Sequence, residues 1–241
     1  MERTLSGISP EELNTLIELY RVTPDEEAEL RRLVAQDRKN GPPRTSMSAF
    51  TVLTDLELEA AEIRCWHSER IPGPLKSQRY ALRQWGLALP KNKVTEVLRR
   101  QETRMRVLTM PDPPRYRAIL SESSLYRMPG GRTPDMVTDQ ASHLLWLMAE
   151  YEQLELRILP FTADIPFVDN DFQLLLFDKT EFSDFAYIEC PGGPRKCERK
   201  SELDKFHAHW TALDSAALDI TDTRRFLTGL LEEKHSQPAT H

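Results

Sequence analysis

The sequence predicts an α+β fold, in which a helix-rich domain surrounds a small mixed sheet. Helical periodicity dominates the first half of the chain, short strand-like runs alternate with helices in the second half, and a Gly192-Gly193 turn indicates a late hairpin. This order of elements argues against a doubly wound parallel sheet. With 241 residues, 39% of them hydrophobic, the chain can form one large domain with a small helical appendage.

The N-terminal segment predicts two short helices, over 9–21 and 23–39. Ser9 and Thr23 each stand before a proline and two acidic residues, a pattern typical of the first turn of a helix. Two helices bury little surface alone, so we expect them to pack on a partner or on the main body. We expect four segments along the chain. A helical remnant spans 1–40, a linker 41–50, a main domain 51–235 and a disordered tail 236–241.

An amphipathic helix is predicted over 53–68, and its apolar face also carries Glu59. The apolar positions of that face are Leu56, Ala60, Ile63 and Trp66. A buried carboxylate is costly unless it is paired. Glu59 is therefore expected either to meet a cation such as Arg64 or Arg115, or to contact a ligand.

Two more helices are predicted before the first strand. One follows the turn formed by residues 71–74 and carries Tyr80 and Trp85. The other spans 92–109, with Arg104 and the neighbouring arginines mostly outward, and ends before a group of prolines.

The rest of the chain is predicted to alternate strands and helices. A hairpin should pair 185–190 with 196–199. The other predicted strands are 116–120, 155–159 and 172–177, and the predicted helices are 134–151, 201–218 and 221–234.

Several classes of protein are excluded by what the sequence lacks. No run approaches the ~20 apolar residues of a membrane span, and the N-terminus lacks the apolar core of a signal peptide, so a cytoplasmic protein is expected. There is no GxSxG elbow, glycine-rich phosphate loop or HExxH pair. We therefore expect no cofactor and assign no catalytic residues. Cys190 and Cys197 flank a turn without a second Cys/His pair nearby, so no metal site is expected.

The charge distribution is uneven. The net charge is −6, yet residues 76–117 carry eleven basic and three acidic residues. This region either binds an anionic ligand or nucleic acid, or is a solvated helix face neutralised by acidic neighbours. Residues 1–50 are acidic by two charges, which disfavours DNA binding there.

The candidate ligand-binding residues combine carboxylates, an arginine and aromatic side chains. Tyr187 and Glu189 alternate on a predicted strand and therefore share a face, which is either the lining of a pocket or plain sheet surface. The six histidines form no chelating set, and only His67 stands near the suspected pocket. The complete candidate set is Glu59, Arg64, Trp66, Tyr80, Trp85, Tyr187 and Glu189.

Six phrases occur along the chain in a characteristic order. They are LELEAAEIRCW (56–66), IPGPLKSQRYA (71–81), LTMPDPPRYRAIL (108–120), LELRILPF (154–161), DFQLLLF (171–177) and AYIE (186–189). This ordered set resembles the large C-terminal domain of actinobacterial XRE-type (lambda-repressor-like) helix-turn-helix regulators, some of which are described as antitoxin-like.

The resemblance carries two further implications. The first forty residues are similar to the end of the DNA-binding module, without its recognition helix, so specific DNA binding is not expected in this form. Where the family has PGLLQT, this chain has Pro72-Gly73-Pro74-Leu75-Lys76-Ser77, and the usual LDE is Leu120-Ser121-Glu122. Both changes fall in loops suited to line a pocket, so the ligand is expected to differ from the family's.

The expected function is that of a regulatory domain descended from a transcription factor. It would bind a small hydrophobic or amphipathic molecule, or a small protein partner, and the sequence is compatible with a homodimer. The alternative is a cofactor-independent cyclase or isomerase in a biosynthetic pathway of secondary metabolism, because such catalysis needs shape and a few polar groups rather than a motif. A third interpretation is a truncated DNA-binding regulator whose gene begins further upstream.

Overall fold

The computed structural model describes residues 46–86, 94–166, 168–180, 182–190 and 193–236, and a few positions between 17 and 32. The chain separates into two units, Met1–Leu53 and Thr54–His241. In the first unit, the predicted helices at 9–21 and 23–39 and the predicted linker lie largely outside the described residues. Most of the described positions between 17 and 32 are helical.

A six-stranded mixed sheet is the centre of the second unit. Its spatial order is β3-β2-β1-β4-β5-β6. The first three of these strands are mutually parallel, and each of the others runs antiparallel to its neighbour. The strands are β1 (Glu62–His67), β2 (Arg115–Ser121), β3 (Leu154–Leu159), β4 (Phe172–Leu176), β5 (Phe185–Ile188) and β6 (Arg195–Cys197).

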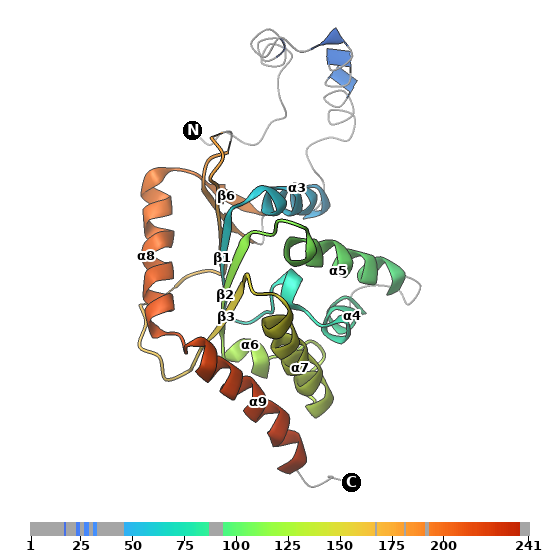
Figure 1. The fold of residues 1–241 in the computed structure, drawn as a ribbon, viewed down its shortest axis with the longest axis vertical. Coiled ribbons are helices and arrows are strands. Elements are labelled where there is room, and N and C mark those ends of the chain that lie inside the picture. Colours follow the sequence, from blue (N-terminus) through green and yellow to red (C-terminus); the bar gives the residue numbers. More distant parts are fainter. Residues whose placement is uncertain are drawn as a thin grey trace. The chain divides into compact units, whose positions relative to one another are not determined.

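Helices cover both faces of this sheet (Figure 1). The described helices are α3 (Ser46–Glu59), η1 (Gly73–Leu75), α4 (Gln78–Gly86), α5 (Val94–Thr109), α6 (Ser123–Tyr126), α7 (Pro134–Glu150), α8 (Lys200–Ala216) and α9 (Ile220–Ser236). In Figure 1, α8 lies over one face, and α4, α5 and α7 lie on the opposite side. Helix α9 packs against α7 and β3. The fold is therefore α+β, as the sequence predicts.

Strand alternation divides the core into two halves. Trp66, Phe172 and Leu174 point toward α8, where they pack with Trp210 and Leu213 of that helix. The alternate residues face the layer of α4, α5 and α7. They include Ile63, Cys65, Tyr116, Leu156 and Leu175, each with at most 1% of its surface exposed.

The helix predicted over 53–68 is wrong in its second half. Helix α3 ends at Glu59, and residues 62–67 form β1, which pairs with β2 on one side and β4 on the other. Apolar residues at positions 56, 60 and 63 fit a helical repeat, but Ile63 and Cys65 also fit a strand with one fully buried face. Pairing on both edges decides in favour of the strand.

The other predicted elements agree with the structure to within a few residues. The strands predicted at 116–120, 155–159 and 172–177 correspond to β2, β3 and β4. The predicted hairpin is confirmed by the antiparallel pairing of β5 with β6. The helices predicted at 134–151, 201–218 and 221–234 are α7, α8 and α9.

Candidate functional site

Glu59 does not occupy the buried position that the sequence predicts. It ends α3 with a half-exposed side chain, and Lys179 Nζ donates to its Oε2 at 2.6 Å. Trp66 is buried on the α8 face of β1. Because these two residues lie in different elements, the predicted pocket wall formed by Glu59 and Trp66 on one helix is wrong.

The other candidate residues are divided between the two sides of the sheet. Arg64 lies on the same face of β1 as Trp66, and its Nε donates to Glu62 Oε1 at 2.7 Å. On the opposite side, the Tyr80 hydroxyl accepts a hydrogen bond from the backbone N–H of Ile71 at 3.4 Å. The side chain of Trp85 lies outside the described residues.

Tyr187 and Glu189 interact electrostatically with each other, and Glu189 also contacts Arg70. Burial, followed by the negative charge of Glu189, raises the pKa of Tyr187 to about 12. Glu189 accepts a hydrogen bond from Arg70 Nη1 at 3.0 Å. Tyr187 lies in β5, whereas Glu189 follows immediately after the end of that strand, so the prediction that both lie on a strand holds for Tyr187 alone. Their role in binding a ligand stays a prediction.

The buried carboxylate of α3 is Glu57, two residues before the predicted one. Glu57 is 1% exposed and forms a bidentate ion pair with Arg104 of α5, whose Nη2 donates at 2.7 Å. Gln173 of β4 donates to the same carboxylate at 2.6 Å, and Arg104 also donates to Thr54 at 3.0 Å. The expectation that Arg104 faces outward is wrong, because this network compensates for its burial.

A second group of charges lies beside this ion pair. The Lys76 cluster comprises Arg70, Lys76, Tyr80, Arg104 and Glu189. Lys76 Nζ lies 5.9 Å from the centre of the Tyr80 ring. Burial, followed by the positive charges of Arg104 and Arg70, lowers the pKa of Lys76 to about 8, and Glu189 opposes that shift. The surroundings thus favour the neutral form of this lysine more than water does.

Two glutamines fix the backbone that carries Lys76. Gln101 Nε2 donates to the carbonyl oxygens of Gly73 and Lys76, at 3.0 Å and 2.8 Å. Gln140 accepts from Ser77 N at 2.9 Å and donates to the carbonyl of Leu75 at 2.8 Å. The turn is therefore tied to both α5 and α7, so the position of Lys76 is well defined.

His67, Ser68 and Asp171 form a third polar group, where β1 ends beside the start of β4. Both the backbone N–H and the hydroxyl of Ser68 donate to Asp171 Oδ1, at 2.9 Å and 2.6 Å. His67 Nδ1 lies 3.2 Å from Asp171 Oδ2. Burial acts to raise the pKa of Asp171, but the interactions with His67 and Ser68 outweigh it and lower that pKa to about 2. Since the serine bonds the aspartate rather than the histidine, the arrangement fixes a loop and does not activate a nucleophile.

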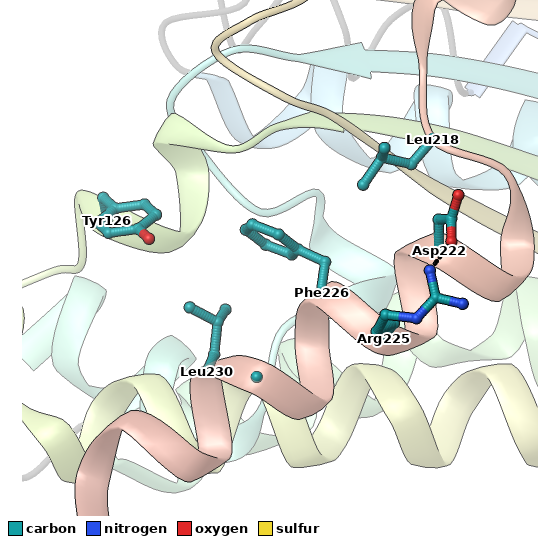
Figure 2. A pocket seen from close by; sticks show the side chains of 7 residues that line it. Tyr126, Leu218, Asp222, Arg225, Phe226 and Leu230 are labelled. Carbon is teal, nitrogen blue, oxygen red and sulfur yellow. Dashed lines mark hydrogen bonds and ion pairs between the residues drawn. The ribbon is translucent and has the colours of Figure 1, made fainter. Parts of the chain in front are cut away.

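A groove lies between α6 and α9, near the carboxyl ends of β2 and β3. Its volume is about 420 Å³. Figure 2 shows Tyr126, Phe226 and Leu230 directed into one space, with the ion pair of Asp222 and Arg225 at its border. We call it the aromatic groove, and its lining consists of Tyr126, Leu218, Asp222, Arg225, Phe226, Gly229 and Leu230.

The aromatic side of the groove continues beyond its lining. Phe161, which follows β3, is 64% exposed, and its ring centroid lies 5.9 Å from that of Tyr126. The guanidinium of Arg132 lies 4.6 Å from the centre of the Tyr126 ring. The sequence alone did not point to Tyr126 and Phe226, because only the fold brings α6 and α9 together.

A wider hollow of about 720 Å³ lies between α4 and the start of α7. Arg79, Arg83, Asp135 and Asp139 line it, and Arg79 Nε lies 3.6 Å from Asp139 Oδ1. Its charges are thus partly paired within the wall, and it contributes few apolar side chains. It resembles a solvated crevice more than a ligand pocket.

In the part of the chain that the structure describes, no three His, Cys, Asp or Glu side chains converge closely enough to hold a metal ion. Within those same residues, no helix has the length and apolar character needed to cross a membrane.

The fold and its grooves define an α+β domain with a mixed sheet, a buried polar network on one side and an aromatic groove at the end of its parallel strands. Residues 50–229 match the family described as Domain of unknown function (DUF5753), and the chain belongs to that family. A comparison with curated proteins finds none that matches this chain.

Proposed function

We propose that the protein is a regulatory domain that binds a small amphipathic molecule in the aromatic groove. The observation that carries this proposal is a group of aromatic side chains left partly open to solvent around a hollow of about 420 Å³. That volume lies within the usual range for small-molecule sites, roughly 300–1,000 Å³.

The chemistry of the lining supports an amphipathic ligand. Phe226, Leu230 and Leu218 supply apolar surface, and the half-exposed Tyr126 adds a ring with a hydroxyl. Covering such side chains releases water from apolar surface, which favours binding by about 25 cal/mol for each Å² removed from solvent. Arg225, with 73% of its side chain exposed, stands at the border and can meet an acidic head group.

The regulatory part of the proposal is supported by the resemblance to helix-turn-helix regulators. In such a protein, a domain that binds a metabolite would change its contacts with a partner when the ligand is present. A ligand site between α6 and α9 suits this role, because α9 also packs on α7 and β3 and could transmit a displacement.

Fluorescence titration with a matched pair of probes tests the proposal. The first is 8-anilinonaphthalene-1-sulfonate, an aromatic anion, and the second is N-phenyl-1-naphthylamine, its counterpart without the sulfonate. We expect saturable binding of both. Phe226→Ser should weaken both, whereas Arg225→Gln should weaken only the sulfonate, because the charge it removes faces the acidic group.

Controls separate binding in the groove from adsorption to exposed aromatic rings. Trp146 on α7 is 47% exposed and outside the groove, so Trp146→Ser should leave both titrations unchanged. Phe161→Ser is a second variant at the edge of the groove. Because the Phe161 ring is more exposed than the Phe226 ring, its removal disturbs the fold less, so it serves if Phe226→Ser fails to fold. Equal losses for Trp146→Ser and the groove variants, or no saturation with wild type, would contradict the proposal.

A further inference from the structure

Gly229 lies in the interior of α9, a position that does not favour glycine. The helix extends from Ile220 to Ser236, so both of its ends are more than a turn away. Glycine is less stable than alanine inside a helix, because a glycine loses more conformational freedom when the chain folds. The residue therefore calls for a reason other than helix formation.

The domain itself does not require a glycine at this position. Gly229 is not among the described glycines with a positive φ, so its backbone suits any residue. An added Cβ would meet nothing within 4 Å among the described residues. At Gly73, by contrast, an added Cβ would lie 2.5 Å from Arg104 Nε. Neither backbone conformation nor internal packing explains Gly229.

The open space in front of Gly229 belongs to the aromatic groove. Asp222, Arg225, Phe226, Gly229 and Leu230 recur every three or four residues and therefore share one face of α9, and all of them line the groove. At Gly229 the backbone itself thus forms the wall. Glycine is the residue that lets a ligand approach a backbone this closely.

We propose that Gly229 selects the ligand of the aromatic groove, and that the ligand class is planar aromatic acids whose ring lies flat against the backbone of α9. This inference rests on the proposed function, because it takes the groove as the ligand site. It adds which molecules the site accepts and names the residue that decides. An alanine at this position would hold a flat ring away from the helix by the depth of its methyl group.

The rings beside Gly229 favour a planar ligand. Phe226 lies one turn before Gly229 on α9, and Tyr126 points into the same space from α6 (Figure 2). Offset-stacked and edge-to-face contacts between aromatic rings contribute beyond the apolar area that they bury, and a saturated ring forgoes that contribution. The groove of about 420 Å³ lies in the lower part of the range for small-molecule sites, roughly 300–1,000 Å³, so it suits one compact ring system.

Arg225 accounts for the acid group of the ligand. It precedes Gly229 by four residues, and residues at this spacing are neighbours on a helix surface. Its side chain is 73% exposed, and its Nη1 bonds Asp222. Because a guanidinium has five N–H donors, this pair leaves others for a ligand carboxylate. A ring on Gly229 therefore places its acid group within reach of Arg225.

Calorimetric titration of the full chain with two acids of the same carbon skeleton tests the inference. The first is 2-naphthoate, which is planar, and the second is decahydro-2-naphthoate, its saturated counterpart. Wild type should bind 2-naphthoate more tightly. Gly229→Ala should weaken that binding about tenfold, because an extra methyl group in a close contact displaces the ring. The same variant should raise the melting temperature by about 2–3 °C, since alanine favours the helix.

The opposite signs of these two effects separate a ligand contact from a structural role. Gly229→Leu fills the groove with a good helix former and should abolish binding of both acids. Thr228→Ala is the matched control, because Thr228 is the exposed neighbour of Gly229 on α9 and does not line the groove, so both affinities should stay unchanged. Wild-type affinity in Gly229→Ala, or a fall in its melting temperature, would overturn the role of Gly229.

The remaining outcomes separate this inference from the proposed function. Equal affinity of wild type for the two acids, or no binding of either, would overturn the planar class. Weakening of 2-naphthoate binding by Phe226→Ser but not by Gly229→Leu would overturn this inference and leave the groove as the ligand site. Binding that neither variant weakens would contradict the groove itself. A change in size-exclusion elution of Gly229→Ala without a change in affinity would assign the groove to a second copy of the chain and overturn the ligand class.

Discussion

Glu57 and Arg104 face each other across 47 residues of sequence as a bidentate ion pair inside the domain. The pair joins α3 to α5, and Gln173 ties it to β4. Burial acts to lower the pKa of Arg104, but the charge and hydrogen bonds of Glu57 outweigh it and raise that pKa. The guanidinium therefore stays charged beside Lys76, so the pair influences the lysine as well as the fold.

Removing the charge of Glu57 should destabilise the domain strongly. Glu57→Gln leaves Arg104 buried without its counter-charge, and we expect a loss of about 3–5 kcal/mol in the free energy of unfolding. Urea denaturation measures it. Glu59→Gln is the matched control, because it breaks an exposed pair with Lys179 and should cost about 1 kcal/mol or less. Similar losses for both variants would show that Glu57 is not the structural carboxylate.

Asp171 should contribute stability that disappears in acid. Its pKa is lowered from 3.8 to about 2 in the folded protein, so the unfolded chain takes up a proton first as the pH falls. The contribution, about 2 kcal/mol, is complete above pH 4 and is lost as the pH approaches 2. Asp171→Asn should therefore be less stable than wild type at pH 6 and approach it near pH 2. The exposed Asp178→Asn provides the control, and a constant difference at all pH values would contradict this role.

Lys76 should make stability rise in mild alkali. Its pKa is about 8 in the folded protein and near 10.5 when unfolded, so between these values only the unfolded chain holds the proton. The free energy of unfolding of wild type should therefore increase relative to Lys76→Met as the pH rises from 8 to 10.5. Taking the difference between the two proteins cancels groups such as Cys65 and Tyr116, whose pKa values burial raises. A flat difference would show that Lys76 has an ordinary pKa.

Gly130 should resist substitution for a conformational reason. Its φ is +76°, a region that other residues rarely adopt, and an added Cβ would lie 2.3 Å from Arg83 Nε. Gly130→Ala should cost about 1–3 kcal/mol of stability, measured by thermal unfolding. Gly131→Ala controls for the contact, because its φ is also positive at +99° but its Cβ would meet nothing within 4 Å. Arg83→Ala should recover part of the loss at Gly130 if the contact matters.

The fold class and the later strands could be predicted because alternation and turn residues encode them locally. Strand β1 could not, since Ile63 fits a helical repeat continued from α3 equally well, and only pairing with β2 and β4 decides. Because the predicted helix continued through residue 68, Glu59 was expected to be the buried carboxylate, and Glu57 was not identified. The aromatic groove depends on Tyr126 and Phe226, which lie 100 residues apart, and no local pattern links them. The sequence singled out Lys76 only as part of the segment that departs from PGLLQT. Nothing in the sequence predicted its burial or the arginines near it.

The most direct test of the central claim is to locate a bound ligand by nuclear magnetic resonance. Titration of isotopically labelled protein with 8-anilinonaphthalene-1-sulfonate should shift the backbone amide signals of Tyr126, Phe226, Gly229 and Leu230 in a saturable way. Trp146 and Tyr151 form another aromatic contact, outside the groove, and their backbone amide signals should not shift. Shifts confined to that second surface, or spread over the molecule without saturation, would contradict the proposal that the aromatic groove is the ligand site.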